Sequence, residues 1–341
     1  MYRKGSSFKD VYIIPQYSEV ESRSLVDTST KIFDNLEIDV PVISSNMDTV
    51  TEGLMAIAMN NAGAIGALHR FMSIEDNVEQ YKFATFRENP QEGTYVLVSI
   101  GVNGESEERA KALYEAGARF FIIDVAHGHS KQMKNMICRM KSRYQDVKDP
   151  IRIMAGNIAT PEAVYDLVTW GADAVKVGIG PGAACLTKNV TGVTMPQFSA
   201  INECSKYLTE STYRQKPQVR LVPIIADGGV TEIGDISKAI GAGASAVMCG
   251  RLFAACNETP GPRLNGKKIY RGMASKDAMI RIKPADSLPT PEGDSIVIDD
   301  EPTTAAEVVK HIKGGLQSAF SYSNAKNLIE FQKNVKFGSR E

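Results

Sequence analysis

The sequence lacks the features that mark several classes of protein. It has no apolar run of about 18 residues or more, so no segment reads as a membrane-spanning helix. The first ten residues have no apolar stretch of the kind a signal peptide needs. Lys plus Arg is 39 and Asp plus Glu is 40, which leaves no positive surplus for nucleic acid or an anionic membrane. We therefore expect a soluble, cytoplasmic protein that binds neither.

Cysteine is scarce and irregularly spaced. There are five cysteines, an odd number without a CxxC pair, which argues against a disulfide framework or a zinc cluster. His127 and His129 lie close enough in sequence to converge on a loop, but no third ligand of matching spacing stands near them. This pattern disfavours a metal site at these histidines.

Eight short apolar runs recur along the chain, and each is followed by a helix-like stretch. The runs are mostly continuous rather than alternating, as expected for parallel strands covered on both faces. They predict a closed (β/α)₈ barrel, a single catalytic domain over residues 1–341, with a doubly wound sheet as the alternative. The runs are Val40–Ser44, Ala64–Leu68, Tyr95–Val102, Phe120–Val125, Ile151–Gly156, Ala174–Gly178, Val222–Ala226 and Ala246–Gly250.

A weak internal repeat marks the helix boundaries. Thr160 before Pro161, and Ser106 before two glutamates, predict helix starts, because these side chains cap free amides and proline fits the first turn. Glycine–alanine pairs predict helix ends, because glycine adopts the left-handed conformation without a Cβ clash. These pairs are Gly63-Ala64, Gly117-Ala118, Gly171-Ala172 and Gly243-Ala244.

A long segment follows the eighth run. Between Gly250 and a final helix expected at residues 305–320, the chain is rich in Pro, Gly, Asp and Lys, without a regular pattern. Such a segment in a compact domain is typically a functional lid. We predict a flap over residues 257–303, and a surface hairpin without a role is the alternative.

The catalytic loops of a barrel follow the carboxyl ends of its strands. The loops after strands seven and eight frequently bind phosphate, because exposed backbone amides can cradle an anion. The rule predicts a phosphate-bearing ligand here, although the glycines could instead only ease packing. It selects Ser44–Asp48, Asp124–Gly128, Gly178–Thr187, Asp227–Gly229 and Gly250-Arg251.

The glycine-rich loop over residues 178–187 is the densest of these stretches. Cys185 lies near its end, where amides and a helix dipole can stabilise a thiolate and make it a nucleophile. Thr187 could handle a proton if a partner activates it. Spacing alone leaves a structural role for Cys185 equally open. For the other four cysteines, we expect core packing.

These stretches resemble the IMP dehydrogenase / GMP reductase family, in family order and over nearly the whole chain. The cysteine loop, VGIGPGAAC, is the most specific of them. The matching segments are Phe8–Val11, Ser44–Thr49, Ile122–Ser130, Ala155–Asn157, Val177–Cys185, Ala226–Gly229, Tyr270–Ser275, Pro291–Gly293 and Gly314–Leu316.

The resemblance implies a (β/α)₈ barrel assembled as a homotetramer, with a defined chemistry. Cys185 would attack C2 of the purine and form a covalent thioimidate. Thr187 and Glu292 would transfer protons. A potassium ion would be held by carbonyls of Gly180, Gly182 and Cys185.

The resemblance also implies binding residues for a purine nucleotide, GMP or IMP, and for a nicotinamide cofactor. The expected nucleotide contacts are Ser45, Met47, Ala183, Asp227, Gly228, Gly229, Gly250, Arg251, Tyr270, Gly272, Met273 and Ala274. The expected cofactor contacts are Asp124, Val125, Ala126, Gly178 and Gly180, with Ser22 and Arg23 as further candidates.

Two residues depart from the family pattern. Ala183 stands where members usually carry serine, so one phosphate hydroxyl is missing. Arg251 stands where a small residue usually follows the phosphate glycine. The arginine could supply a compensating charge to the phosphate, or it could point to solvent.

Three features favour the reductase, which converts GMP to IMP and ammonia with NADPH. The chain has no room for the CBS insert that most dehydrogenases carry between strands two and three. Asn46 stands where reductases have asparagine and dehydrogenases usually proline. The stretch from Met279 to Glu292 is short, and its only arginine, Arg281, precedes isoleucine rather than the tyrosine of the water-activating dehydrogenase pair.

Other residues favour the dehydrogenase, which oxidises IMP to XMP with NAD. Pro289 stands where reductases carry an arginine, and the segments Tyr270–Met273 and Pro291–Gly293 are closer to dehydrogenases. Arg70 replaces the lysine of many reductases. We expect a divergent GMP reductase, with an IMP dehydrogenase lacking CBS domains as the alternative. A nucleotide sensor without activity is a third hypothesis, opposed by the retained Cys185, Thr187 and Glu292.

Overall fold

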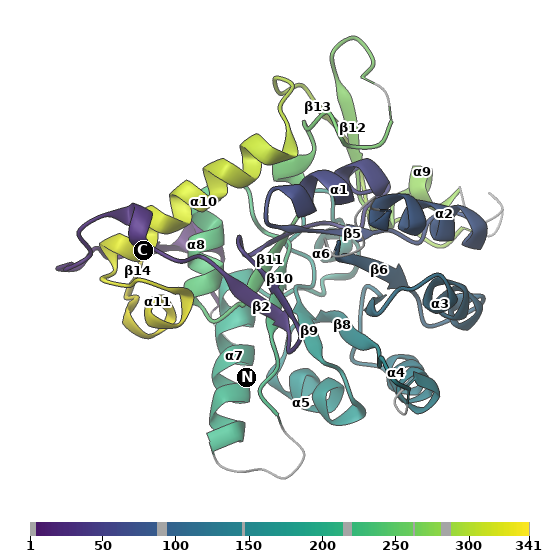
Figure 1. Ribbon diagram of the computed structural model, residues 1–341, viewed down its shortest axis with the longest axis horizontal. Coiled ribbons are helices and arrows are strands. Elements are labelled where there is room, and N and C mark those ends of the chain that lie inside the picture. Colours follow the sequence, from purple (N-terminus) through teal and green to yellow (C-terminus); the bar gives the residue numbers. More distant parts are fainter. Residues whose placement is uncertain are drawn as a thin grey trace.

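Eight parallel strands close into a barrel at the centre of the molecule (Figure 1). The computed structural model describes residues 5–86, 94–144, 147–213, 220–261, 263–280 and 288–340. The barrel confirms the predicted fold, and each predicted run overlaps one of its strands, although β8 and β10 extend beyond the ends of their runs. Around the ring they are β10 (Ile224–Asp227), β11 (Ala246–Cys249), β4 (Val42–Ser44), β5 (Ile65–Leu68), β6 (Val96–Ile100), β7 (Phe120–Asp124), β8 (Arg152–Ile158) and β9 (Ala174–Val177).

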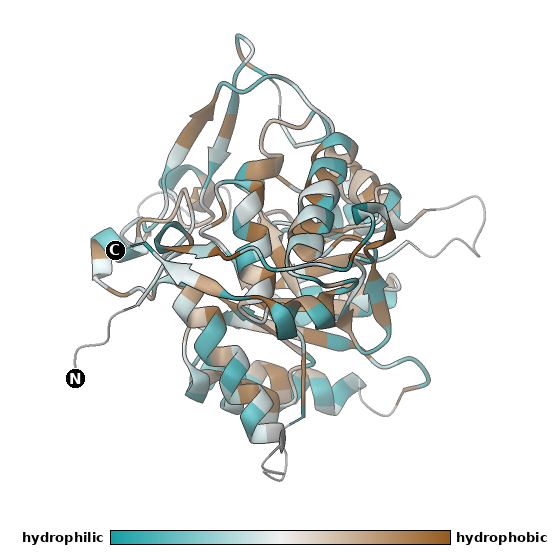
Figure 2. Ribbon diagram, turned by 90° about the vertical axis from the view of Figure 1, so that its left-hand side faces the viewer, coloured by the Kyte–Doolittle hydropathy of each residue, from teal (hydrophilic) through white to brown (hydrophobic). Residues whose placement is uncertain are grey.

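The barrel strands read as continuous apolar runs because both of their faces are buried. Inward side chains such as Ile43, Leu97 and Met154 join the apolar residues of a hairpin, β2 (Thr30–Phe33) and β3 (Leu36–Ile38), in one cluster. Outward side chains form a second cluster with the surrounding helices. Figure 2 shows hydrophobic residues concentrated on the central strands, whereas the helices carry hydrophilic residues as well. This packing fixes the strand ends from which the loops project.

Helices alternate with the barrel strands and cover the outside of the ring (Figure 1). None of those in the described parts of the chain is long and apolar enough to cross a membrane. They are α1 (Gly53–Asn61), α2 (Ile74–Thr85), α3 (Ser106–Glu115), α4 (Lys131–Tyr144), α5 (Pro161–Trp170), α6 (Thr187–Thr191), α7 (Gln197–Tyr213), α8 (Ile233–Gly241), α9 (Lys276–Met279), α10 (Ala305–Tyr322) and α11 (Leu328–Asn334).

Most of the predicted helix boundaries are confirmed. The four glycines of the repeated pairs have φ between 79° and 113°, the left-handed conformation that ends α1, α3, α5 and α8. The Thr160 side chain accepts a hydrogen bond from the Ala163 amide at the start of α5. The prediction for Ser106 was wrong by one position. Glu105 is the N-cap of α3, and the Ser106 hydroxyl bonds the Asn103 carbonyl instead.

The chain does not end with the helix expected at residues 305–320. That helix is α10, and a further helix, α11, follows it. The last strand of the described residues, β14 (Phe337–Ser339), then pairs antiparallel with β1 (Val11–Ile13). The prediction missed these elements because α11 is short and β14 contains a glycine.

The predicted flap segment contains regular structure. Strands β12 (Lys268–Arg271) and β13 (Ser295–Ile298) pair antiparallel and stand out from the barrel at the top of Figure 1. The short helix α9 follows β12. The expectation of an irregular segment was therefore wrong for these residues. Arg281, the arginine that precedes isoleucine rather than tyrosine, lies outside the described residues.

Candidate active site

A cavity of about 690 Å³ opens at the carboxyl ends of the barrel strands. All five loops selected from the sequence contribute to its wall. Residues 270, 272–274, 279, 292 and 293 of the flap segment line it as well. The barrel thus gathers residues from the whole length of the chain around one space, as the strand-end rule predicts.

Cys185, Thr187 and Glu292 form a chain of hydrogen bonds along this cavity. The Cys185 thiol donates to Thr187 Oγ1 at 3.3 Å, and the Thr187 hydroxyl donates to Glu292 Oε2 at 2.8 Å. Cys185 is partly exposed and immediately precedes Leu186, the N-cap of the short helix α6. The donors point in one direction, from sulfur to carboxylate, which is the arrangement needed to withdraw the thiol proton.

Backbone hydrogen bonds fix Glu292 against the cysteine loop. The Leu186 amide donates to the Glu292 carbonyl at 2.7 Å, and the Asp294 amide donates to the Ala184 carbonyl at 2.9 Å. The Glu292 amide donates in turn to the Ala274 carbonyl. Two stretches about a hundred residues apart are therefore held in register as in a small sheet. The carboxylate is placed by backbone and does not depend on its own side-chain packing.

The remaining cysteines are unsuited to this chemistry. Cys204, Cys249 and Cys256 are buried. Burial raises the pKa of the Cys204 and Cys256 thiols to about 12, so they stay protonated and inert. Cys138 is exposed on α4, which corrects the expectation that it packs in the core. Its side chain lies on the outer helix layer, and it does not line the cavity.

A buried lysine on β9 joins two predicted binding residues. Lys176 is 2 % exposed, and its Nζ lies 2.8 Å from Asp124 Oδ1 and also binds Asp227. Asn157 accepts from the same amine and donates to Asp227 Oδ2 at 2.9 Å. No role for Lys176 was predicted from the sequence. Its signal was a lone charge inside an apolar strand, which rarely occurs without a buried partner.

The charges of this cluster stabilise one another. Burial disfavours the Asp124 carboxylate, but the Lys176 ammonium and a hydrogen bond from Asn46 outweigh it and hold the pKa of Asp124 below its ordinary value. Burial likewise disfavours the Lys176 ammonium, but the two carboxylates raise its pKa. Asp124 and Lys176 are therefore both ionised near neutral pH, and Asp124 and Asp227 both line the cavity wall.

The loops after β10 and β11 form the end of the cavity expected to hold phosphate. Gly228 and Gly229 have φ of 88° and 82°, which leaves their amides available in a tight turn. A Cβ on Gly250 would lie 2.6 Å from the Tyr270 hydroxyl and 2.9 Å from Met47 Sδ, so a larger residue there would have to displace these side chains. Arg251 lines the same end.

The other end of the cavity includes a loop that the sequence analysis missed. Residues 101–106, after β6, line the wall together with Arg70, Phe71 and Arg109. Arg109 is held by Glu105, by Asn77 and by two carbonyls. Arg70 packs over the Phe71 ring, and its Nε is buried without a hydrogen-bond partner in the described chain. No recognisable motif marked this loop.

The structure places all the predicted nucleotide contacts on the cavity wall. Of the predicted cofactor contacts, Asp124, Val125, Ala126, Gly178 and Gly180 line it, and so does Gly182 of the potassium set. Ser22 and Arg23 do not line it. They lie at a short 3₁₀ turn, Arg23–Leu25, where Arg23 donates to Ser318 of α10.

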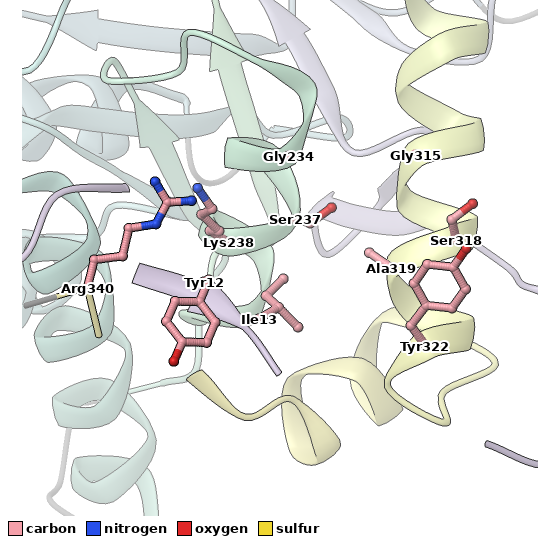
Figure 3. A pocket seen from close by; sticks show the side chains of 10 residues that line it. All are labelled: Tyr12, Ile13, Gly234, Ser237, Lys238, Gly315, Ser318, Ala319, Tyr322 and Arg340. Carbon is pink, nitrogen blue, oxygen red and sulfur yellow. The ribbon is translucent and has the colours of Figure 1, made fainter. Parts of the chain in front are cut away.

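A second, smaller groove of about 280 Å³ lies between β1, α8 and α10 (Figure 3). Tyr12 and Tyr322 flank it, and Lys238 and Arg340 are its charged lining residues. It holds none of the residues predicted for catalysis or binding. The large cavity is therefore the candidate active site.

The family model described as IMP dehydrogenase / GMP reductase domain matches residues 5–340 of this chain. The chain belongs to the IMP dehydrogenase / GMP reductase family. This confirms the resemblance drawn from the motifs and makes the protein a member of a family of purine-nucleotide oxidoreductases that act on IMP or GMP.

Curated relatives carry both of the family's names. An inosine-5'-monophosphate dehydrogenase of Cryptosporidium parvum is 35% identical over 387 residues, covering 98% of this chain and 92% of that protein. A GMP reductase of Leishmania donovani is 30% identical over 476 residues, covering 98% and 94%. An inosine-5'-monophosphate dehydrogenase of Nitrosopumilus maritimus is 29% identical over 474 residues, covering 98% and 96%. These identities do not separate the two activities.

Proposed function

We propose that the protein is a GMP reductase, which converts GMP to IMP and ammonia with NADPH. The observation that carries the proposal is the hydrogen bond from Asn46 Nδ2 to Asp124 Oδ2, 3.0 Å long. Proline, usual at this position in dehydrogenases, has no side-chain donor and could not make it. Asn46 therefore orients a carboxylate expected to meet the cofactor.

The catalytic hydrogen bonds supply the proton transfers that this reaction needs. Transfer of the Cys185 proton through Thr187 to Glu292 leaves a thiolate, which attacks C2 of the purine. The same path, run in reverse, returns a proton to the departing 2-amino group, so that ammonia leaves and a thioimidate forms. Once C2 is reduced, the thiolate is expelled and IMP is released.

Beyond the loops expected to hold the nucleotide, the cavity offers polar groups for the nicotinamide part of NADPH. It continues past Asp124 to residues 101–106, where Arg70 Nε is a buried donor without a partner. When bound, NADPH supplies the hydride that reduces C2. Asp124, held by Lys176 and Asn46, orients the cofactor ribose or amide by accepting hydrogen bonds.

We also propose the potassium site and the homotetramer that the family resemblance implies. The site uses carbonyls of Gly180, Gly182 and Cys185, since hard oxygen dipoles suit an alkali cation. The Gly182 carbonyl already accepts the Cys185 amide at 3.1 Å, which curves this loop. A carbonyl oxygen has a second lone pair, so this bond is compatible with a cation. Light scattering of the purified protein tests the tetramer.

An IMP dehydrogenase is the second candidate. The relative from Cryptosporidium parvum, named for that activity, is more similar to this chain than the named reductase is. A dehydrogenase must activate water to hydrolyse its intermediate. Arg70 is the described residue best suited to supply that base, because burial lowers the pKa of its guanidinium at the cavity wall.

A paired spectrophotometric assay in potassium buffer tests the proposal. One reaction holds GMP with NADPH or NADH, and the other holds IMP with NAD. Loss of reduced-cofactor absorbance with GMP, accompanied by ammonia, is the expected result. A gain of absorbance with IMP and no reaction with GMP would replace the reductase with the dehydrogenase, and an Arg70→Met variant would then test the base.

A further inference from the structure

Arg251 carries a charge at a point where the cavity wall otherwise offers glycine amides. It directly follows Gly250 after β11 and lines the cavity near Tyr270. Ala183, which lines the same cavity, is exposed and has no hydroxyl to offer a phosphate. The cavity wall therefore has an added cation at Arg251 and no side-chain hydroxyl at position 183.

The other cations of the cavity wall either form ion pairs with carboxylates or lie near the residues expected to bind the cofactor. Lys176 is held between Asp124 and Asp227, and Arg109 is held by Glu105. Arg70 neighbours Asp124, at the end assigned to the cofactor. Among the described lining residues, this leaves Arg251 as the cation best placed for an anion at the glycine loops.

Arg251 has a partner that can be exchanged. Its Nη1 lies 2.6 Å from Asp300 Oδ2, and the two side chains are 34 % and 50 % exposed. Ion pairs this open to water are weak. Asp300 stands just beyond β13, so the contact ties the flap segment to the barrel loop after β11. A guanidinium binds phosphate with the same paired geometry that it uses for carboxylate, and phosphate carries more charge.

We propose that the Arg251–Asp300 ion pair is a latch that the substrate's phosphate opens. The guanidinium leaves Asp300 and binds the phosphate, replacing the hydroxyl that Ala183 lacks. Phosphate binding thereby releases one contact between the barrel and the flap segment. This deepens the proposed function, because the ligand is the phosphate of the same nucleotide. It holds for either of the two candidate reactions, since IMP is the product of the reductase and the substrate of the dehydrogenase.

Calorimetric titration of the full-length protein with IMP and with inosine tests the phosphate contact without turnover. Arg251→Ala should weaken IMP binding about tenfold or more, the usual loss of a charged hydrogen bond. Inosine, which has no phosphate, should bind both proteins equally. Equal IMP affinity, or an equal loss for inosine, would overturn the contact.

The latch also predicts how replacing Asp300 changes the affinity for IMP. Asp300→Asn should tighten IMP binding roughly two- to fivefold, because the phosphate no longer competes with an exposed carboxylate. Asp299→Asn is the matched control. It removes the same charge one position away, but Asp299 pairs with Lys267 rather than with Arg251. It should leave the affinity unchanged.

The double variant Arg251→Ala/Asp300→Asn separates the latch from general electrostatics. The gain in IMP affinity from Asp300→Asn should disappear when Arg251 is absent, since Asp300 and the phosphate then have no guanidinium to compete for. A gain that persists in the double variant, or one that Asp299→Asn matches, would overturn the latch. Because these titrations use no cofactor, failure of the reductase assay and failure of the latch remain distinguishable.

Discussion

Lys176 Nζ on β9 lies 2.8 Å from Asp124 Oδ1 at the end of β7 and also binds Asp227 at the end of β10. One buried ammonium thus joins the carboxylate expected to meet the cofactor to the carboxylate expected to meet the nucleotide ribose. With both carboxylates attached to the same charge, neither can turn toward a ligand independently. The cluster therefore sets the relative placement of the two substrates.

Replacing Lys176 with methionine should leave two carboxylates facing each other without a cation. We expect a loss of about 3 kcal/mol in the free energy of unfolding, the usual cost of breaking a buried ion pair. Urea denaturation measures it. Lys267→Met removes an exposed lysine paired with Asp299 and should change the free energy by less than about 1 kcal/mol. Equal values for the two variants would show that the cluster does not stabilise the barrel.

The same cluster predicts a pH dependence of stability. The folded-state pKa of Asp124 lies below its unfolded value of about 3.9, so its contribution is complete above that value and is lost as the pH falls through the folded pKa. The difference in unfolding free energy between the wild type and Asp124→Asn should therefore be constant from about pH 7 to pH 5. It should shrink below about pH 4. A difference that grows on acidification would reverse the assigned direction.

Cys185→Ala should abolish turnover, because Cys249, the other described thiol of the cavity wall, is buried, and burial raises the pKa of that thiol. Nucleotide binding should survive, since the phosphate end of the cavity is untouched. Cys138→Ala, a change at an exposed cysteine of α4, should retain full activity. Steady-state rates and IMP titration of both variants measure this. Residual turnover of the Cys185 variant near the wild-type rate would rule out the covalent mechanism.

Glu292→Gln should keep the hydrogen bond from Thr187 and remove the group that accepts its proton. We expect kcat to fall about 100-fold or more with little change in nucleotide affinity, which is typical of a lost general base. Thr187→Val should produce a similar loss, and Thr187→Ser should restore most of the rate because it keeps the hydroxyl. If the Thr187→Val variant is as active as the Thr187→Ser variant, the proton does not pass through the side chain at position 187.

The barrel was predictable because its strands and helix ends carry local signals. A strand buried on both faces is mainly apolar, as in Ala246–Cys249, and a left-handed helix end favours glycine, as at Gly171. α11 and β14 carry weaker signals, since their placement depends on contacts with α8 and β1. The prediction of Ser106 as the N-cap was wrong because α3 begins one residue earlier than expected, so that Ser106 is its first residue and Glu105 is the N-cap.

The site divides in the same way. The glycine loops and Cys185 were identifiable because a barrel brings its strand ends together and because these motifs are specific. The environment of Arg70 and the loop over residues 101–106 could not be identified from the sequence, since only the folded chain brings them to the part of the cavity expected to hold the cofactor. The pairing of Arg251 with Asp300 likewise joins residues of two segments whose contact no spacing could reveal.

Gly178 tests how closely the site depends on the backbone of its loops. It has φ of 152°, and a Cβ there would lie 1.9 Å from the Asp227 carbonyl oxygen. Gly178→Ala must therefore displace either the cysteine loop or the loop after β10, and we expect kcat/KM to fall at least about 100-fold. Gly314→Ala is the matched control, because its Cβ would meet no atom within 4 Å on α10. The control should keep its activity and gain up to about 1 kcal/mol of stability, since alanine favours a helix. Wild-type activity in Gly178→Ala would show that these loops tolerate movement and that their amides do not position the substrate.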